Sequence, residues 1–148
     1  MNYDTIDNHL AAAGSIERAA MPLGLYVAWC ANLGLLSQTF ADQHHALVMR
    51  VRYREVKGSE LLVAGCGGEL GPEHLNPAGR AFTESYYPRY LQDFHATFPG
   101  DIYQLEDNWH NYDEIAAVIT RAYMGPASGR RSGAAAGSEE KRWWQVWR

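Results

Sequence analysis

Residues 21–33 carry no charged side chain, and apolar side chains occupy nearly every position. Pro22 stands where the first turn of a helix tolerates proline, and Gly34 follows where a helix commonly ends. A helix that has no polar face must be covered on every side. The pattern therefore predicts a helix over residues 21–33 at the centre of the hydrophobic core.

A second helical pattern begins after Ser37, a residue type that caps helix N-termini. Positions spaced by three and four are occupied by Phe40, His44, Leu47, Val48 and Val51. From residue 47 to residue 54 the chain also alternates apolar and basic side chains, which is typical of a strand. We favour a helix for residues 47–54, because no second strand with turn signals lies nearby to pair with it.

Two more helical patterns lie in the middle of the chain. Residues 59–63 predict a short helix that ends at Gly65. Residues 79–98 predict a long helix with an aromatic ring at every fourth position, at Phe82, Tyr86, Tyr90, Phe94 and Phe98. Pro88 must break or kink this helix, because proline removes a backbone hydrogen bond and clashes with the preceding turn.

The last helix opens with Asn111 as its cap and Glu114 three residues later, which is a capping-box arrangement. Five helices and no paired strands predict an all-α fold. We expect an irregular bundle of about five helices packed around the apolar helix at 21–33.

The composition changes after residue 124. Residues 125–140 are rich in Gly, Ala and Ser and offer little to bury, which predicts a flexible linker. Residues 141–148 form a basic tail with three tryptophans, Trp143, Trp144 and Trp147. We therefore divide the 148 residues into a helical domain at 1–124, a linker at 125–140 and a tail at 141–148.

Charge is unevenly distributed along the chain. The formal net charge is −4, but residues 1–124 hold 15 acids and 8 bases, a net −7, whereas residues 125–148 hold 2 acids and 5 bases, a net +3. An acidic domain repels phosphate backbones, which argues against nucleic acid as a partner. It favours a basic partner protein instead, because opposite charges speed and orient docking.

Residue types that carry chemistry are scattered along the chain. His44 and His45 are adjacent and diverge on a helix, so they predict no metal site, and His9 stands alone in the sequence. Cys30 and Cys66 are too few for a disulfide framework and suit buried, reduced thiols. We find no phosphate-binding loop and no catalytic grouping, and so expect no metal, no cofactor and no enzymatic activity.

The sequence also bears on location. No segment reaches the roughly 18 apolar residues that a membrane helix needs, and the start of the chain lacks the order of a signal peptide. We therefore expect a cytoplasmic protein. The tail at 141–148 is short, at little more than two helical turns, so we favour its folding back or docking to a partner over contact with an anionic membrane.

Three stretches of the chain together resemble a known family. They are residues 19–35, 58–94 and 103–115, and they include Ala28-Trp29, Cys66-Gly67-Gly68-Glu69-Leu70, Tyr90-Leu91-Gln92-Asp93-Phe94 and Glu106-Asp107-Asn108-Trp109. Their order and spacing are similar to those of small bacterial immunity proteins found beside secreted polymorphic toxins, including type VI and Rhs effectors. The resemblance covers roughly residues 1–124. Members of that family often carry histidine where Pro22 stands and aspartate where Gly67 stands.

The resemblance implies an antitoxin that binds and neutralises a cognate toxin by direct contact in interbacterial competition, and it supplies no catalytic residue. We expect these contacts on an acidic, aromatic edge formed by Glu106, Asp107, Trp109, His110, Tyr112 and Asp113, with the tail residues Trp143, Trp144 and Trp147 as a second partner-binding set. Aromatic residues dominate interface energetics, and rim charges set the encounter rate. The structural alternative is that Trp109 and Tyr112 pack under the last helix while the carboxylates cap it.

A competing function is that of an enzyme or small-ligand protein with an aromatic pocket lined by Trp29, Tyr86, Tyr87 and Tyr90. Aromatic side chains that recur at helical spacing are usually part of a core, because each buries a large apolar area. We therefore favour the partner-binding function.

Overall fold

The computed structural model describes residues 2–130, with side chains described through residue 125. The chain divides into two compact units, the first ending at Ala116 and the second beginning at Ala117. The elements in chain order are β1 (Asp4–Thr5), α1 (Asp7–Ala13), α2 (Ile16–Asn32), α3 (Gln38–Gln43), α4 (His45–Arg52), α5 (Gly58–Ala64), β2 (Glu69–Leu70), the 3-10 turn η1 (Pro72–His74), α6 (Pro77–Thr97), the 3-10 turn η2 (Ile102–Gln104) and α7 (Trp109–Arg130). The all-α prediction is confirmed, because residues 2–130 hold seven α-helices and only two strands of two residues each.

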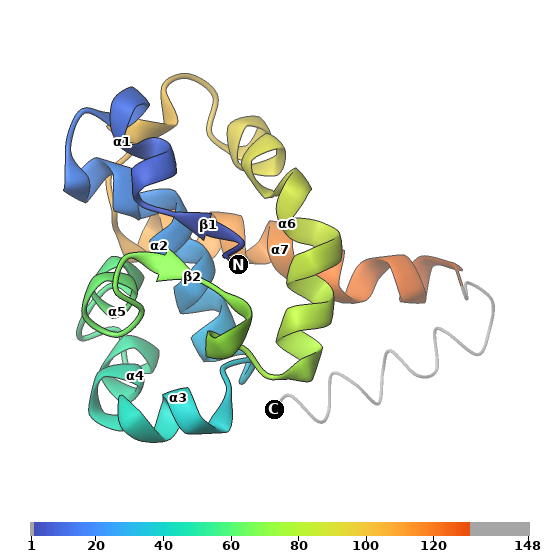
Figure 1. Ribbon diagram of the computed structural model, residues 1–148. Coiled ribbons are helices and arrows are strands. Elements are labelled where there is room, and N and C mark those ends of the chain that lie inside the picture. The colour runs from blue at the N-terminus through green and yellow to red at the C-terminus, as the bar shows by residue number, and fades with distance from the viewer. Residues whose placement is uncertain (1, 131–148) are drawn as a thin grey trace. The chain divides into compact units, whose positions relative to one another are not determined.

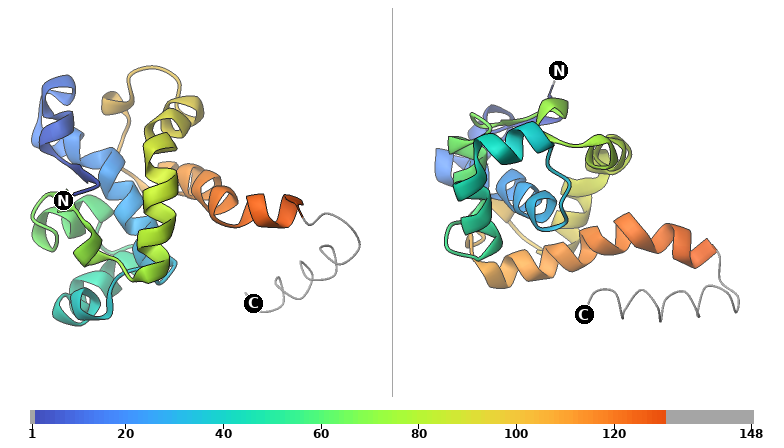
Figure 2. Two further views of the ribbon diagram at one scale, coloured as in Figure 1. Left: turned by 45° about the vertical axis from the view of Figure 1, so that its right-hand side comes forward. Right: turned by 90° about the horizontal axis from the view of Figure 1, so that it is seen from below.

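The helix α2 forms the centre of the core, as its uncharged sequence predicts. Every residue from Ala19 to Ala31 is buried, and α4, α5 and α6 lie around it in the first unit (Figures 1 and 2). Its start differs from the expected one. Ser15 caps the helix by accepting a hydrogen bond from the Arg18 N–H at 3.2 Å, so α2 begins earlier and Pro22 lies inside the helix rather than in its first turn.

The backbones of α2 and α5 meet directly at Gly24 and Gly58. A Cβ atom added to Gly58 would lie 2.0 Å from the carbonyl oxygen of Gly24, and one added to Gly24 would lie 2.7 Å from the Cα of Ser59. Both distances are below 3.0 Å, a separation that real Cβ atoms essentially never show. The two glycines therefore allow the start of α5 to rest directly on α2.

The helix that we favoured for residues 47–54 is present as α4, His45–Arg52, so the strand alternative is wrong. The single helix expected from Ser37 onward is instead two helices. Ser37 caps α3 as predicted, accepting from the Phe40 N–H at 3.1 Å. His44 then leaves the helical conformation, with φ −119° and ψ 33°, and α4 starts after it.

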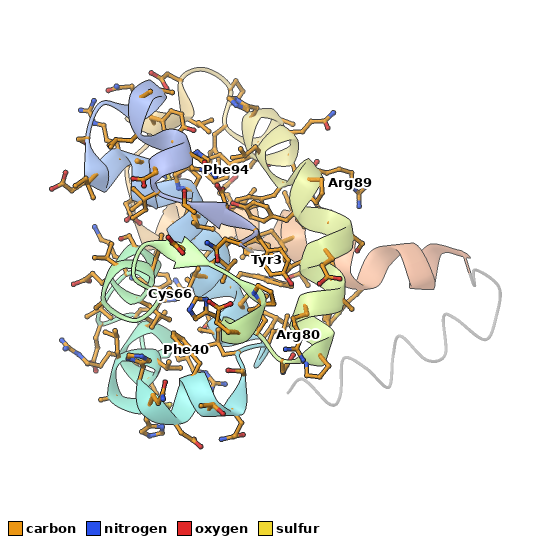
Figure 3. The ribbon with its side chains drawn as sticks, in the orientation of Figure 1. Tyr3, Phe40, Cys66, Arg80, Arg89 and Phe94 are labelled. Atoms are coloured by element: carbon orange, nitrogen blue, oxygen red, sulfur yellow. The ribbon has the colours of Figure 1, made fainter. Side chains whose placement is uncertain are left out.

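The aromatic helix α6 runs without a break through Pro88, and its axis bends between its first half and its C-terminal end (Figure 1). Its rings pack against α2, with the centroid of Tyr26 lying 5.0 Å from that of Tyr87 and 5.1 Å from that of Tyr90. Phe94 points toward the N-terminal elements, whereas Arg89 points away from the helix (Figure 3). The predicted kink therefore bends the helix but leaves its apolar side on the core.

The N-terminal residues are paired with the segment after α5. Asp4 lies opposite Leu70 and Thr5 opposite Glu69 in the antiparallel pair β1–β2. Just before β1, Tyr3 lies near α6 (Figure 3), where its hydroxyl donates to Glu84 Oε2 at 3.1 Å. These contacts join three segments that are far apart in the sequence.

The helix α7 begins at Trp109, and its cap is Asn108 rather than the expected Asn111. The side-chain oxygen of Asn108 accepts a hydrogen bond from the Asn111 N–H at 2.8 Å. The helix continues to Arg130 and so passes through residues 125–130, where we expected a linker. The rest of the expected linker and the tail at 141–148 lie outside the described residues, and the domain boundaries remain a prediction.

Candidate functional site

The end of α4 places an arginine in an unusual backbone conformation. The N–H of Arg54 donates to the Val51 carbonyl at 2.9 Å, and the N–H of Glu55 donates to the Arg50 carbonyl at 2.7 Å. This hydrogen-bond pattern is a Schellman motif, whose left-handed position is usually occupied by glycine. Arg54 occupies that position with φ 63°, and within residues 2–130 it is the only non-glycine residue with positive φ.

The side chain of Arg54 reaches the first turns of α7. Its guanidinium carbon lies 5.0 Å from the ring centroid of Trp109 and 5.7 Å from that of Tyr112. Its two terminal nitrogens donate to the Asp113 carboxylate, at 2.6 Å to Oδ1 and 3.2 Å to Oδ2. We call Arg54, Trp109, Tyr112 and Asp113 the Arg54 cluster. Hydrogen bonding to Asp113 raises the pKa of the Arg54 guanidinium further above its usual value.

The cluster contributes little net stability. The side chains of Arg54 and Asp113 are 46% and 56% exposed, and ion pairs this exposed contribute about 0–1 kcal/mol. An exposed cation–π contact adds about 0.5–1 kcal/mol. The left-handed backbone of a non-glycine residue costs about 1–2 kcal/mol. Because these contributions nearly cancel, stability alone does not account for an arginine at position 54.

Tyr112 fixes this part of α7 to the core. Its side chain is buried, with 4% of the residue exposed, and its hydroxyl accepts a hydrogen bond from Asn32 Nδ2 at 2.7 Å. The Trp109 ring meets the Tyr112 ring edge to face, with centroids 5.1 Å apart. Trp109 and Asp113 are four residues apart on the helix, so they lie on one face. Arg54 therefore lies over a platform that is itself held firmly.

The loop before α7 is held by a second contact. Ser59, at the start of α5, donates from its hydroxyl to Asp107 Oδ2 at 2.8 Å. Burial raises the pKa of the Asp107 carboxyl, an effect that the Ser59 hydrogen bond and the charge of Lys57 oppose only in part. Since α5 rests directly on α2 at Gly24 and Gly58, this hydrogen bond ties the loop to a helix that contacts the central helix through its backbone.

The structure brings the expected edge residues together but gives them different roles. Glu106, His110 and Asp113 are exposed, whereas Asp107 and Trp109 are partly buried. His110 Nε2 lies 3.9 Å from Glu114 Oε2. The Tyr112 ring lies under the Arg54 guanidinium and Tyr112 is 4% exposed, so its expected contact with a partner stays a prediction.

The structural alternative for the same residues is partly met. Tyr112, on α7 itself, does pack into the core, but the cap of that helix is the amide oxygen of Asn108 and not a carboxylate. The other expected partner-binding residues, Trp143, Trp144 and Trp147, lie outside the described part of the chain. The sequence analysis did not include Arg54 in this edge, although its position two residues after the end of α4 is a signal once the helix is known.

A second polar cluster, also missed in the sequence, lies inside the first unit. His9 Nε2 is 2.7 Å from Asp4 Oδ2, and His9 Nδ1 is 2.6 Å from the hydroxyl of Tyr103. Tyr87 donates to the same Asp4 oxygen at 2.5 Å. His9 is 3% exposed and Asp4 is 6% exposed, so His9 is not the isolated histidine that its sequence context indicated. We call these four residues the Asp4 cluster.

The surroundings of Asp4 decide its charge. Burial alone would raise the pKa of its carboxyl, but hydrogen bonds from His9, Tyr87 and Asn8 outweigh that effect and hold the pKa below its usual value. Burial, together with the charge of Asp4, raises the pKa of Tyr87 well above its usual value. The carboxylate is therefore the charged member of the pair with Tyr87, and the phenol is its donor.

The remaining chemical candidates lie in the core. Trp29, Tyr86 and Tyr90 are at most 1% exposed and Tyr87 is 9% exposed, and their rings pack on α2 and on one another. Burial raises the pKa of the Cys66 thiol to about 12. Among residues 2–130, no three His, Cys, Asp or Glu side chains gather closely enough to hold a metal ion.

The length and hydropathy of the helices bear on whether they could span a membrane. None of those in the described part of the chain is both long and apolar enough to cross a bilayer.

Residues 2–110 match the model of one protein family, which is described as a domain of unknown function, DUF7832. The chain belongs to this family. The DUF7832 match includes Arg54, Asp107 and Trp109 and ends in the first turn of α7, and the family description names no activity or partner. No curated protein and no solved structure matches the chain.

Proposed function

We propose that this protein is a bacterial immunity protein, which binds a cognate secreted toxin in the cytoplasm and neutralises it by direct protein–protein contact. The proposal rests on the resemblance of residues 1–124 to immunity proteins encoded beside polymorphic toxins. The structural observation that supports it best is a surface held by hydrogen bonds, with Glu106, His110 and Asp113 exposed and Asp107 and Trp109 partly buried. We call this the 106–113 surface.

The rigidity of this surface favours binding. Asn108 caps α7, Ser59 holds Asp107, and the buried Tyr112 fastens the first turn of the helix to α2. Side chains that are already ordered lose less conformational freedom when a partner docks, which improves affinity. Tryptophan and arginine are also the residue types that contribute most to binding hot spots, and here Trp109 and Arg54 are in contact.

The charge of this region favours a basic partner. Residues 55–114 carry 11 acids and only three bases, Lys57, Arg80 and Arg89. Carboxylates at the rim of an interface raise the association rate with a positively charged protein, and this effect weakens as salt is added. We therefore expect the toxin to present a basic surface to the 106–113 surface.

The test begins with the product of the neighbouring gene. Co-expression with a toxic C-terminal domain encoded there should restore growth, and the two proteins should co-purify. The double variant Trp109→Ala with Asp107→Lys should lower affinity for that toxin more than tenfold in calorimetry. The matched control is Ile16→Ala with Glu17→Lys at the start of α2, which changes an exposed apolar residue and a neighbouring acid in the same way.

The outcomes of these experiments test the immunity role and the 106–113 surface separately. Growth arrest despite co-expression, with no complex formed, contradicts an immunity role. If the complex forms but the 106–113 double variant, still folded, binds within threefold of wild type, then the toxin docks elsewhere and the surface assignment is wrong.

A further inference from the structure

The Arg54 cluster contains the parts of a guanidinium-binding site. Trp109 and Tyr112 offer aromatic rings 5.0 and 5.7 Å from the guanidinium carbon. Asp113 offers both carboxylate oxygens at hydrogen-bonding distance. A ring face together with a two-oxygen carboxylate matches the planar, forked shape of an arginine side chain and suits a lysine ammonium less well.

Arg54, which fills this site, is held weakly, whereas the residues that form the site are held firmly. Arg54 is anchored only by contacts at the surface, and its backbone is in a conformation that favours glycine. By contrast, Tyr112 is buried and hydrogen-bonded to Asn32. An exposed arginine can leave such a site by rotating its side chain, with no change in the surrounding helices.

The charges next to the site favour a second arginine as the replacement. Glu106 and Asp107 precede Trp109 in the chain, and Glu114 follows Asp113. When Arg54 swings away, the Asp113 carboxylate loses its cation, and a cation from another molecule gains this contact within an acidic stretch of the chain. A carboxylate from a partner would instead have to approach this acidic group.

We infer that Trp109, Tyr112 and Asp113 form an arginine-binding site that Arg54 fills in the free protein and that an arginine of a basic partner fills in the complex. The identity of the partner as a toxin rests on the proposed function, whereas the site does not. Arg54 thus acts as an internal competitor, which keeps the Trp109 ring covered until a partner with a matching arginine docks.

The site is tested first with a small probe on the full chain. The variant Arg54→Gly empties the site, and glycine suits the left-handed backbone at this position. We would titrate the blocked peptide acetyl-Gly-Arg-Gly-amide and follow the indole N–H of Trp109 by NMR, with its signal identified from a Trp109→Phe sample. The peptide with citrulline in place of arginine has nearly the same shape without the charge and serves as the matched control.

The expected result has three parts. Arg54→Gly should bind the arginine peptide in the millimolar range, at least fivefold more tightly than the citrulline peptide and at least fivefold more tightly than wild type does. Adding Asp113→Asn to Arg54→Gly should abolish this preference for arginine. Equal binding of the two peptides, or equal binding by wild type and Arg54→Gly, overturns the inference. If Arg54→Gly is unfolded by circular dichroism, Arg54→Ala takes its place in the same titration.

Replacing Arg54 changes the affinity for the toxin in opposite directions for the two roles that Arg54 can have in the complex. If the partner brings an arginine, Arg54→Gly should bind the toxin at least threefold more tightly than Arg52→Ala, a control that removes one positive charge two residues away. If Arg54 itself contacts an acidic group of the toxin, affinity falls instead, and the inference is wrong. A chain that binds the arginine peptide as expected but shows no complex with the toxin contradicts the proposed function and leaves the arginine site in place.

Discussion

The Asp4 cluster and the Arg54 cluster use similar chemistry in opposite surroundings. Each joins a carboxylate to a nitrogen-containing side chain, His9 or Arg54, and to aromatic side chains from distant parts of the chain. Asp4 and His9 are at most 6% exposed, whereas the side chains of Arg54 and Asp113 are about half exposed, at 46% and 56%. Burial is therefore the main difference between them.

That difference separates stability from recognition. In the interior, removing one member leaves the other members without a partner and without water, which is costly. At the surface, water replaces a lost partner at little cost. The Asp4 cluster is thus suited to holding β1, α1, α6 and η2 together, and the Arg54 cluster is suited to exchanging partners.

The largest effect is expected from Asp4→Ala. It leaves His9 and Tyr87 buried without their common acceptor, so the free energy of unfolding should fall by about 3–5 kcal/mol. Urea unfolding followed by circular dichroism measures this change. Asp7→Ala, which removes an exposed acid from the first turn of α1, should change it by no more than about 0.5 kcal/mol. Comparable losses in both variants would show that burial does not distinguish Asp4.

The next effect is a dependence on pH. The pKa of Asp4 is lowered in the folded state, so its contribution is complete above the unfolded value of about 3.9 and is lost as pH falls through the lower, folded value. Each unit of lowering corresponds to about 1.4 kcal/mol. We therefore expect the difference in unfolding free energy between wild type and Asp4→Asn to shrink between pH 6 and pH 2.5. A constant difference over this range contradicts the charged carboxylate.

The smallest effect is expected at Arg54. Arg54→Gly loses the surface contacts and relieves the left-handed strain, so its unfolding free energy should lie within about 1 kcal/mol of wild type. Arg54→Ala loses the same contacts but keeps the strain, and should be less stable than Arg54→Gly by about 1 kcal/mol. Thermal melts of both variants in low and high salt provide the measurement. A loss above 2 kcal/mol in Arg54→Gly means that the cluster is a stabilising element after all.

The sequence predicted those elements whose signal is local. The uncharged stretch at 21–33 identified the buried helix, and the Ser37 cap and the Gly65 stop were correct. The predicted starts of two helices were wrong, because in each case two nearby residues are both typical of a helix N-terminus. Pro22 suggested a helix start, but Ser15 provides the actual cap, and Asn111 suggested a cap that Asn108 provides.

The polar clusters could not be predicted, because their members meet only in the folded chain. His9 contacts Tyr103 across 94 positions, and Arg54 contacts Asp113 across 59. No spacing rule links residues at such separations. All six residues of the predicted edge lie within positions 106–113, which is why the sequence could group them, and their role in partner binding stays a prediction. Arg54 lies just after α4, far from these residues in the sequence, so only the structure shows that it contacts them.

The direct backbone contact between α2 and α5 has a consequence for redesign. Because no side chain separates Gly24 from Gly58, the two helices meet at this point through their backbones. Ser59, the next residue, transmits that fixed position to Asp107 through its hydrogen bond. A combinatorial library that varies Glu106, Trp109 and His110 would leave this support untouched. The domain can therefore serve as a scaffold for selecting binding variants at these positions without changes to its core.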